Sequence, residues 1–359
     1  MNVLDLVRPE LRAMTGYSSA RMEAGSTGVL LNANESPWPQ DPARPLHRYP
    51  EPQPPELRER LAAVYGVSAS QLLIGRGSDE AIDLVIRALC RAGRDAIMIQ
   101  SPTFGMYAVA ATVQDAAVVD APLALDRAAS FDVDAVLREV TPTTRIVFVC
   151  SPNNPTGGIV ERGEILRLAA ALAGRALVVV DEAYIEFADA PSLAGDVAVT
   201  PNLAVLRTLS KAHALAGARI GCLIGAPALV DALRRIMAPY PLPTPCVLDA
   251  LAALEPASLA VTARRVALIR SERGRMQAAL LQCDGVREVL PSHANFLCVR
   301  FADAGAALGR LRDAGLIVRD VRRHAALHDA LRISVGAPVE NDRVLAILGA
   351  ARTPREVAA

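Results

Sequence analysis

The segment LAVLRTLSKAHALAGARIGCLIG (Leu203–Gly225) contains two short apolar runs, Leu203–Thr208 and Arg219–Gly225, around a polar connection that holds Lys211. Runs of this length without strict alternation of apolar and polar residues are typical of strands covered on both faces. The segment therefore predicts two strands of a sheet that lies between layers of helices. It also predicts that Lys211 lies just beyond the end of the first of these strands.

Similar apolar runs recur upstream, and helical patterns separate several of them. The runs are Ala96–Gln100, Ala117–Asp120, Arg145–Cys150 and Ala176–Asp181. The helical patterns are Glu56–Tyr65, Glu80–Arg91, Asp132–Val140, Gly163–Leu172 and Pro227–Met237. This alternation predicts an α/β fold, with a large domain built on a mostly parallel central sheet that helices flank.

The last third of the chain has a different pattern. A long helix is expected over Ser258–Gln282, and shorter strands and helices follow it, at Val286–Leu290, Ala294–Arg300, Ala304–Ala314, Ile317–Arg319, Leu331–Val335 and Val339–Ala350. We therefore expect an N-terminal arm at residues 1–30 that joins the small domain, a large domain at 31–255, and a smaller α+β domain at 256–359. The proline-rich residues 37–55 are expected to form an extended connection.

Polar residues follow the ends of three expected strands. Asn154 comes after the run at 145–150, and Lys211 comes after the run at 203–208. Asp181 ends the run at 176–181, directly after its apolar residues, and Tyr184 follows. Each has an ordinary structural explanation, such as a turn or a helix cap. Because ligands bind at the carboxyl ends of parallel strands, the combination indicates a ligand site there.

Lys211 is the only lysine among 38 lysine and arginine residues. Arginine is not deprotonated in proteins and forms no Schiff base, whereas a lysine amine does both. An unchanged surface residue is the alternative explanation. A lysine retained alone at a strand end favours a chemical role.

Composition excludes several classes of protein. The net charge is zero, with 38 acidic residues, which argues against a nucleic-acid partner. The apolar runs are too short to span a membrane, and the first residues show no secretory signal, so a cytoplasmic location is expected. The six cysteines are scattered, which favours buried free thiols over disulfides or a metal site.

Nine motifs together carry a resemblance that covers nearly the whole chain. They are LNANE (Leu31–Glu35), RYPEPQP (Arg48–Pro54), GRGSDE (Gly75–Glu80), PTFGMY (Pro102–Tyr107), CSPNNPTG (Cys150–Gly157), VDEAYIEF (Val180–Phe187), RTLSKAHALAGARIG (Arg207–Gly221), APYPL (Ala238–Leu242) and LRISVG (Leu331–Gly336). The sequence resembles the fold-type-I aminotransferases that depend on pyridoxal 5'-phosphate, and among them the histidinol-phosphate aminotransferase family.

The resemblance implies a set of cofactor contacts. Lys211 would form the Schiff base and move a proton, Asp181 would pair with the ring nitrogen, and Tyr184 and Asn154 would contact the ring oxygen. Phe104 would stack on the ring. The cofactor phosphate would be held by Ser78, Asp79, Thr208, Ser210 and Arg219. Tyr49, from the other subunit, would also bind the cofactor.

The same resemblance implies the substrates and a partner. L-Histidinol phosphate would donate its amino group to 2-oxoglutarate, which yields imidazole acetol phosphate and glutamate in histidine biosynthesis. Arg332 and Arg319 would bind the anionic group, because planar guanidinium groups suit carboxylate and phosphate. Tyr17 and Tyr49 would lie at the mouth of the site, and Tyr17 and Asn34 would bind substrate. Because Tyr49 would cross between subunits, a homodimer with shared active sites is expected.

Three alternatives remain open from the sequence. An aromatic amino-acid aminotransferase and a threonine-phosphate decarboxylase share the fold and the cofactor. A regulator that binds an effector without catalysis belongs to another class of protein, and its usual DNA-binding domain has no room before Leu31. The intact set of Lys211, Asp181, Tyr184 and Arg219 favours an enzyme.

Overall fold

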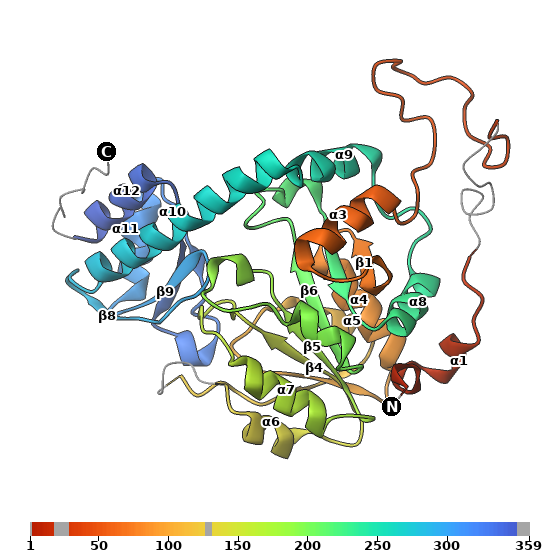
Figure 1. The fold of residues 1–359 in the computed structure, drawn as a ribbon. Coiled ribbons are helices and arrows are strands. Elements are labelled where there is room, and N and C mark those ends of the chain that lie inside the picture. Colours follow the sequence, from red (N-terminus) through yellow and green to blue (C-terminus); the bar gives the residue numbers. More distant parts are fainter. Residues whose placement is uncertain (1, 18–28, 126–130, 350–359) are drawn as a thin grey trace.

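A computed structural model describes residues 2–17, 29–125 and 131–349, and shows a large and a small sheet, each covered by helices (Figure 1). The large sheet has seven strands in the order β1-β7-β6-β5-β4-β2-β3. They span β1 Leu72–Gly75, β2 Ala96–Ile99, β3 Ala117–Asp120, β4 Thr144–Cys150, β5 Leu177–Asp181, β6 Leu203–Thr208 and β7 Gly221–Ile224. β7 pairs antiparallel with β1 and β6, and the other pairings are parallel. The predicted α/β class is confirmed.

Alternate residues of the central strands enter two separate cores, one on each face of the sheet. On β5, Val178 and Val180 belong to the first core, and Leu177 and Val179 belong to the second. This explains why the strand appears as one unbroken apolar run, since both faces are buried. The arrangement places the carboxyl ends of β4, β5 and β6 side by side.

Helices cover both faces. The first core includes side chains of α3 Pro55–Tyr65, α6 Val133–Glu139, α7 Arg162–Ala171, η4 Leu193–Ala198 and α9 Thr244–Ala253. The second includes side chains of η1 Val3–Leu6, α4 Ser78–Leu89, α5 Met106–Val113 and α8 Pro227–Ile236. Short elements complete the large unit, at α1 Pro9–Arg12, η2 Ala69–Gln71, η3 Ile185–Phe187 and η5 Ala216–Ala218.

The small sheet is antiparallel and has the order β10-β11-β9-β8. Its strands are β8 Val286–Val289, β9 Phe296–Phe301, β10 Arg319–Asp320 and β11 Ala330–Ser334. The helices α10 Pro256–Leu280, α11 Ala304–Asp313, η6 Ala325–Leu327 and α12 Pro338–Leu348 accompany it. Figure 1 shows α10 running from α9 to this sheet, so one helix connects the two parts. The domain boundary after residue 255 stays a prediction.

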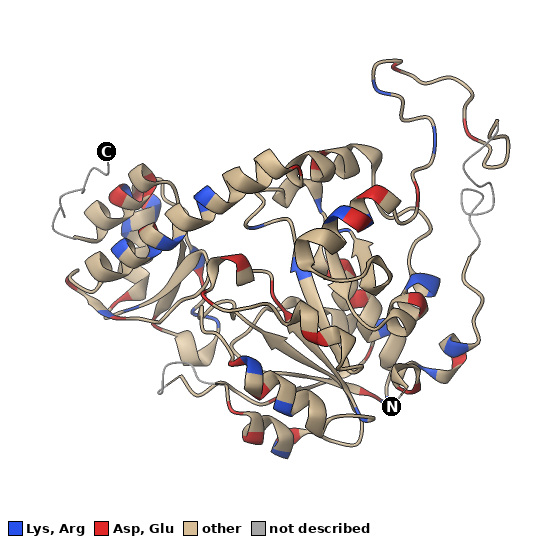
Figure 2. Ribbon diagram, in the orientation of Figure 1, with Lys and Arg blue, Asp and Glu red and all other residues tan. Residues whose placement is uncertain are grey.

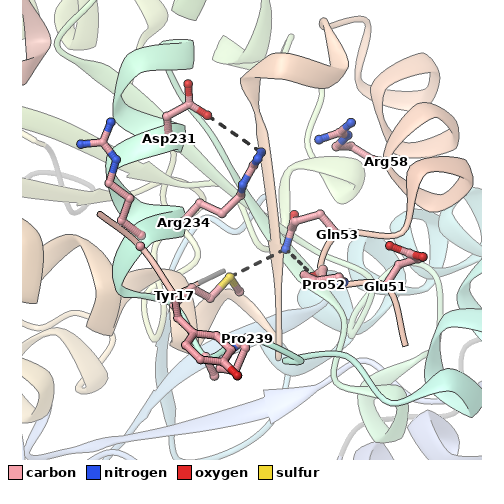
Figure 3. A pocket seen from close by; sticks show the side chains of 12 residues that line it. Tyr17, Glu51, Pro52, Gln53, Arg58, Asp231, Arg234 and Pro239 are labelled. Atoms are coloured by element: carbon pink, nitrogen blue, oxygen red, sulfur yellow. Dashed lines mark hydrogen bonds and ion pairs between the residues drawn. The ribbon is translucent and has the colours of Figure 1, made fainter. Parts of the chain in front are cut away.

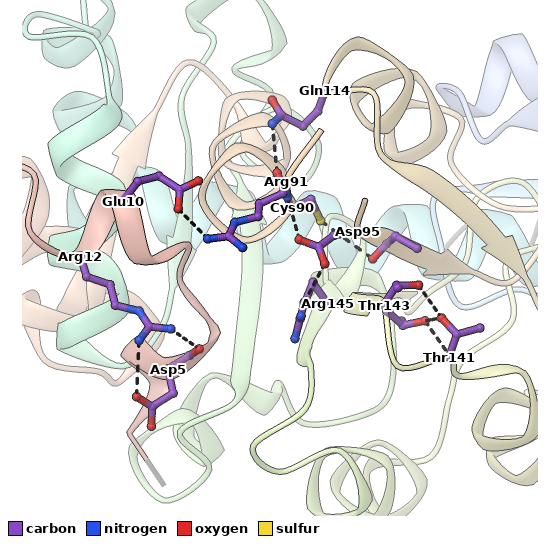
Figure 4. A network of polar contacts seen from close by, with 12 residues as sticks. Asp5, Glu10, Arg12, Cys90, Arg91, Asp95, Gln114, Thr141, Thr143 and Arg145 are labelled. Carbon is purple, nitrogen blue, oxygen red and sulfur yellow. Dashed lines mark hydrogen bonds and ion pairs between the residues drawn. The ribbon is translucent and has the colours of Figure 1, made fainter. Parts of the chain in front are cut away.

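The N-terminal segment corrects one expectation. Residues 1–30 were expected to join the small domain, but Val3, Leu6 and Val7 are buried in the core beneath α4 and α8 of the large sheet. Polar contacts attach the same segment, since Arg91 donates to Glu10 at 3.1 Å (Figure 4). The apolar side chains of η1 determine this placement, because they complete a face that the large sheet would otherwise expose.

Residues 29–48 lie away from both sheets and extend outward in Figure 1. Their apolar side chains are exposed: Leu31 is 87% exposed and Trp38 is 78% exposed. An ion pair of 2.8 Å between Arg48 and Glu35 closes the base of this segment.

The distribution of charged and apolar residues in the structure agrees with the zero net charge of the sequence. Figure 2 shows acidic and basic residues interspersed over the helices of both parts. Within the described ranges, no single helix is long and apolar enough to cross a bilayer, and α9 and α10 pass that test only as a pair bent by 72°. The same residues include no cluster of three or more potential metal ligands. All six cysteines are free, and five are buried.

The packing of η1 predicts the stability of one matched pair of variants. Val7 is 1% exposed and Val199 is 80% exposed. We expect Val7→Ala to lower the free energy of unfolding by about 1–3 kcal/mol, because it removes two buried methyl groups, and Val199→Ala to change it by less than about 0.5 kcal/mol. Urea unfolding of both variants measures this. Equal stability of the two would contradict the placement of the segment.

Candidate active site

A cavity of about 140 Å³ lies at the carboxyl ends of the central strands. Asp181 is the last residue of β5, Thr208 is the last of β6, and Asn154 follows β4. Every residue predicted to bind the cofactor, except Tyr49, lines this cavity: Ser78, Asp79, Phe104, Asn154, Asp181, Tyr184, Thr208, Ser210, Lys211 and Arg219. The fold thus brings together side chains that are up to 141 positions apart in the printed numbering.

Asp181 places a carboxylate at the inner end of this cavity, and it is only 3% exposed. Its Oδ2 accepts a 2.7 Å hydrogen bond from the hydroxyl of Tyr107, and its Oδ1 accepts one of 3.1 Å from the N–H of Ala183. Burial raises the pKa of Asp181, and these two hydrogen bonds act against that rise. None of the ion pairs among the described residues includes Asp181. A cationic ligand in the cavity could therefore pair with its carboxylate.

Tyr107 is a functional residue that the sequence interpretation missed. Its ring is fully buried and stacks on Phe148, with the ring centres 4.6 Å apart. It lies in α5, a helix that was also not predicted, within the PTFGMY motif. That motif was the available signal, but nothing in its spacing pointed to Asp181.

The opposite end of the cavity offers donors to an anion. α4 begins at Ser78, and its N-cap Gly77 makes no side-chain capping bond, so backbone N–H groups of the first turn lack a cap. Arg219 lies against this turn, and its Nη2 donates to Asp79 at 3.0 Å. A Cβ on Gly77 would lie 2.7 Å from that nitrogen, and Gly77 has a φ of +82°, so both space and conformation require glycine.

Lys211 lines the same cavity. Its Nζ is 5.6 Å from the ring centre of Tyr184, whose hydroxyl accepts a 3.5 Å hydrogen bond from Asn154. Desolvation lowers the pKa of Lys211, and the positive charge of Arg332 lowers it further. A lysine with a lowered pKa has a larger share of neutral, nucleophilic amine at a given pH.

A second cavity of about 650 Å³ adjoins the first, because Phe104, Asn154, Tyr184 and Lys211 line both. The predicted substrate residues Arg319 and Arg332 line it, together with Arg323 and His324, for which the sequence interpretation had no role. Arg332 donates to Asn154, and its guanidinium carbon is 5.1 Å from the ring centre of Phe296. Its Nε is buried without a hydrogen-bond partner.

Three predicted residues do not line either cavity around Lys211. Tyr17 lines a separate pocket of about 470 Å³ beside Gln53 and Arg234 (Figure 3). Asn34 and Tyr49 line another, and Tyr49 stacks on Tyr240 with ring centres 4.4 Å apart. Within one chain, Tyr17 and Tyr49, which were expected at the mouth of the site, and Asn34, which was expected to bind substrate, lie outside these two cavities, and their roles stay predictions. All three precede α3 in the chain, and residues 29–48 extend away from both sheets (Figure 1).

A buried charge network lies under the site and joins the strands that carry it. Arg207 of β6 donates to Glu182 at 3.4 Å and to Glu186 at 2.7 Å, and Glu182 accepts a 2.7 Å bond from the N–H of Leu193. Glu182 follows Asp181 directly, and Arg207 precedes Thr208. The network therefore holds the end of β5 against the end of β6.

Comparisons with known proteins agree with this geometry. The profile of the family "Aminotransferase class I and II" matches residues 27–348. The chain belongs to this family. A curated histidinol-phosphate aminotransferase of Stenotrophomonas maltophilia is 57% identical over 355 residues, which cover 98% of both chains. One of Xylella fastidiosa is 56% identical over 351 residues, with 96% of both chains covered.

A solved structure supports the same assignment. The histidinol-phosphate aminotransferase of Sinorhizobium meliloti, in complex with pyridoxal-5'-phosphate, is 29% identical and has a TM-score of 0.73. The match covers 84% of this chain and 82% of that one. Within the aminotransferase family, the chain is therefore a member of the histidinol-phosphate aminotransferases.

The hydrogen bond between Tyr107 and Asp181 yields a prediction with a defined sign. Tyr107→Phe removes a bond that lowers the pKa of Asp181, so that pKa rises and the carboxylate is protonated at a higher pH. As the pH is lowered, the affinity for the cofactor should therefore begin to fall at a higher pH in Tyr107→Phe than in the wild type. Cofactor titration across pH, followed by absorbance, measures this.

The matched control is Tyr65→Phe, which removes a hydroxyl beside the core on the other face of the sheet. It should leave the pH profile of cofactor binding unchanged. Identical profiles for Tyr107→Phe and the wild type would show that the bond does not tune Asp181.

Proposed function

We propose that this protein is a pyridoxal phosphate-dependent transaminase that converts L-histidinol phosphate and 2-oxoglutarate into imidazole acetol phosphate and L-glutamate, a step in histidine biosynthesis. The observation that carries the proposal is the only lysine of the chain, Lys211, in one cavity with the buried carboxylate of Asp181. The identity of 57% and 56% to two curated histidinol-phosphate aminotransferases favours this reaction over the aromatic aminotransferase and decarboxylase alternatives.

The residues present suit pyridoxal phosphate. Asp181 supplies a buried anion without an ion pair for a protonated ring nitrogen, and α4 with Arg219 supplies donors for a phosphate at the other end. When bound, the cofactor supplies an aldehyde carbon and an electron-withdrawing ring, which stabilises negative charge at the carbon that loses its proton.

The protein's own groups then have separate tasks. The Nζ of Lys211 would hold the cofactor at its aldehyde carbon, and the free amine would move the proton at the substrate carbon. Asp181 would keep a proton on the ring nitrogen, because a buried carboxylate favours a cation beside it. Tyr184 and Asn154 would bind the ring oxygen, and Phe104 would cover the ring.

Substrate binding falls to the larger cavity. Arg332, supported by Arg319, binds the anionic group next to the reacting carbon, which is a phosphate ester in one substrate and a carboxylate in the other. The cofactor phosphate would be held separately, by Thr208, Ser210, Ser78, Asp79 and Arg219, which line the smaller cavity. This division keeps the two anions apart, so that one substrate replaces the other without loss of the cofactor.

A homodimer follows from the exposed N-terminal segment. We infer that residues 29–48 cover a second copy of the chain and bring Tyr49 to the partner's cofactor, while Asn34 and Tyr17 close the mouth of a site shared between the subunits. The exposed Leu31 and Trp38 supply the apolar surface that such an interface needs. We propose that this dimer works in the cytoplasm and binds neither nucleic acid nor membrane.

Lys211 offers a direct test of the cofactor assignment. Borohydride reduction of the holoenzyme should attach the pyridoxyl group to Lys211, which blocks the only site for a lysine-specific protease. The unreduced protein, once unfolded, should be cut into two fragments, and mass spectrometry measures both. Normal cleavage after reduction would rule out Lys211.

A mixing experiment tests the shared site. Lys211→Ala and Tyr49→Ala each damage both sites of their own dimer. In a mixed dimer, one site would combine an intact Lys211 with an intact Tyr49 from the partner, so mixing should restore activity at limiting cofactor. Coexpression with two affinity tags isolates the mixed dimer. If the mixed dimer is no more active than its parents, Tyr49 serves its own chain.

A further inference from the structure

Arg319 and Arg332 form one cationic centre in the larger cavity. They are directly opposite each other in the antiparallel pairing of β10 with β11. Side chains of opposed residues lie on the same face of a sheet, and their Cβ atoms are about 5 Å apart. The buried Nε of Arg332 lacks a partner, so this centre retains free donors for one anionic group.

Arg323 reaches the same cavity from another direction. It lies between β10 and η6 in the small domain, yet its Nη2 would be 3.5 Å from a Cβ built on Gly105 of the large domain. The guanidinium thus lies beside the loop that carries Phe104. Among the described residues, its side chain has no hydrogen bond and no ion pair, so its charge is available to a ligand.

The neighbouring Arg322 shows the contrast. It donates twice to Asp320, at 3.0 Å and 2.7 Å, and it does not line the cavity. Asp320 is the one carboxylate among the residues that line this cavity, and these bonds lower its pKa to about 2. Asp320 is therefore committed to Arg322, and the cavity keeps a second, unpaired cation at Arg323.

The proposed substrates differ in the group far from the reacting carbon. Histidinol phosphate has an imidazole there, whereas glutamate and 2-oxoglutarate have a second carboxylate. A carboxylate taken from water without a cation or donors is strongly disfavoured. A site that accepts both must offer a cation for the second carboxylate that the imidazole does not need.

We propose that Arg323 binds the second carboxylate of glutamate and 2-oxoglutarate, while Arg319 and Arg332 bind the anionic group that all substrates share. The inference rests on the proposed function and assigns the dicarboxylate specificity of that site. Gly105 contributes space, because its lack of a side chain lets the guanidinium approach the loop.

Steady-state kinetics separate the two substrates. In Arg323→Ala, the KM for 2-oxoglutarate should rise about tenfold or more, and the KM for histidinol phosphate should stay within about twofold, because a charged hydrogen bond of this kind is lost with only one of them. Arg323→Lys should fall between wild type and Arg323→Ala. Arg310→Ala, which removes an exposed arginine of α11 that does not line the cavity, is the control and should change neither KM.

A second acceptor tests the group itself. 2-Oxobutyrate has a single carboxylate, so Arg323→Ala should turn it over with the same kcat/KM as the wild type. A comparable rise in the KM of histidinol phosphate, or an unchanged KM for 2-oxoglutarate in Arg323→Ala, would overturn the proposal.

Binding of glutarate, an unreactive dicarboxylate, decides the matter without turnover. Calorimetry of the holoenzyme should give a Kd for glutarate that is about tenfold weaker in Arg323→Ala and unchanged in Arg310→Ala. A wild type that does not transaminate histidinol phosphate would refute the proposed function alone. An unchanged glutarate Kd in Arg323→Ala would refute the Arg323 inference alone.

Discussion

The hydrogen bond from Tyr107 to the buried carboxylate of Asp181 joins the second core to the chemistry of the site. A carboxylate in this position is disfavoured by desolvation, and only its donors and a cationic ligand offset that cost. The position of Asp181 depends on β5 being buried on both faces, and the position of Tyr107 depends on its stacking against Phe148. The sheet thus keeps the carboxylate of Asp181 out of contact with water, which would otherwise screen its charge.

The neighbouring strand ends carry charges that are partly balanced. Arg207 forms ion pairs with both Glu182 and Glu186 and so offsets part of their negative charge beneath the site. The charged groups that line the two cavities include Asp181, Lys211 and arginines of the small domain. Burial lowers the pKa of Lys211, and the positive charge of Arg332, which lies on the separate small sheet, lowers it further. Any change in the position of the small domain would therefore change how readily the amine gives up its proton.

The sequence was informative where burial and chemistry coincide. The runs that became β4, β5 and β6 are apolar because both faces are covered, and the residues after them are polar because they line a cavity, so Asp181 and Lys211 were predictable. Tyr107 was not, since its contact joins residues 74 positions apart and a buried tyrosine resembles ordinary core. Arg323 was hidden for the opposite reason, because one of two adjacent exposed arginines resembles surface charge. The placement of η1 depended on a groove that only the folded helices create, and the four-residue β1 is too short to give a distinct pattern.

Trp38 lies on the exposed N-terminal segment and is the only tryptophan in the chain. Neither the large sheet nor the small one contains an indole ring. Ultraviolet emission excited at the red edge of protein absorbance therefore originates from a single position, 78% exposed in the isolated chain, and reports on that position alone. The chain therefore carries one intrinsic fluorophore at that excitation wavelength, on the segment that extends outward, and no other residue contributes to the emission.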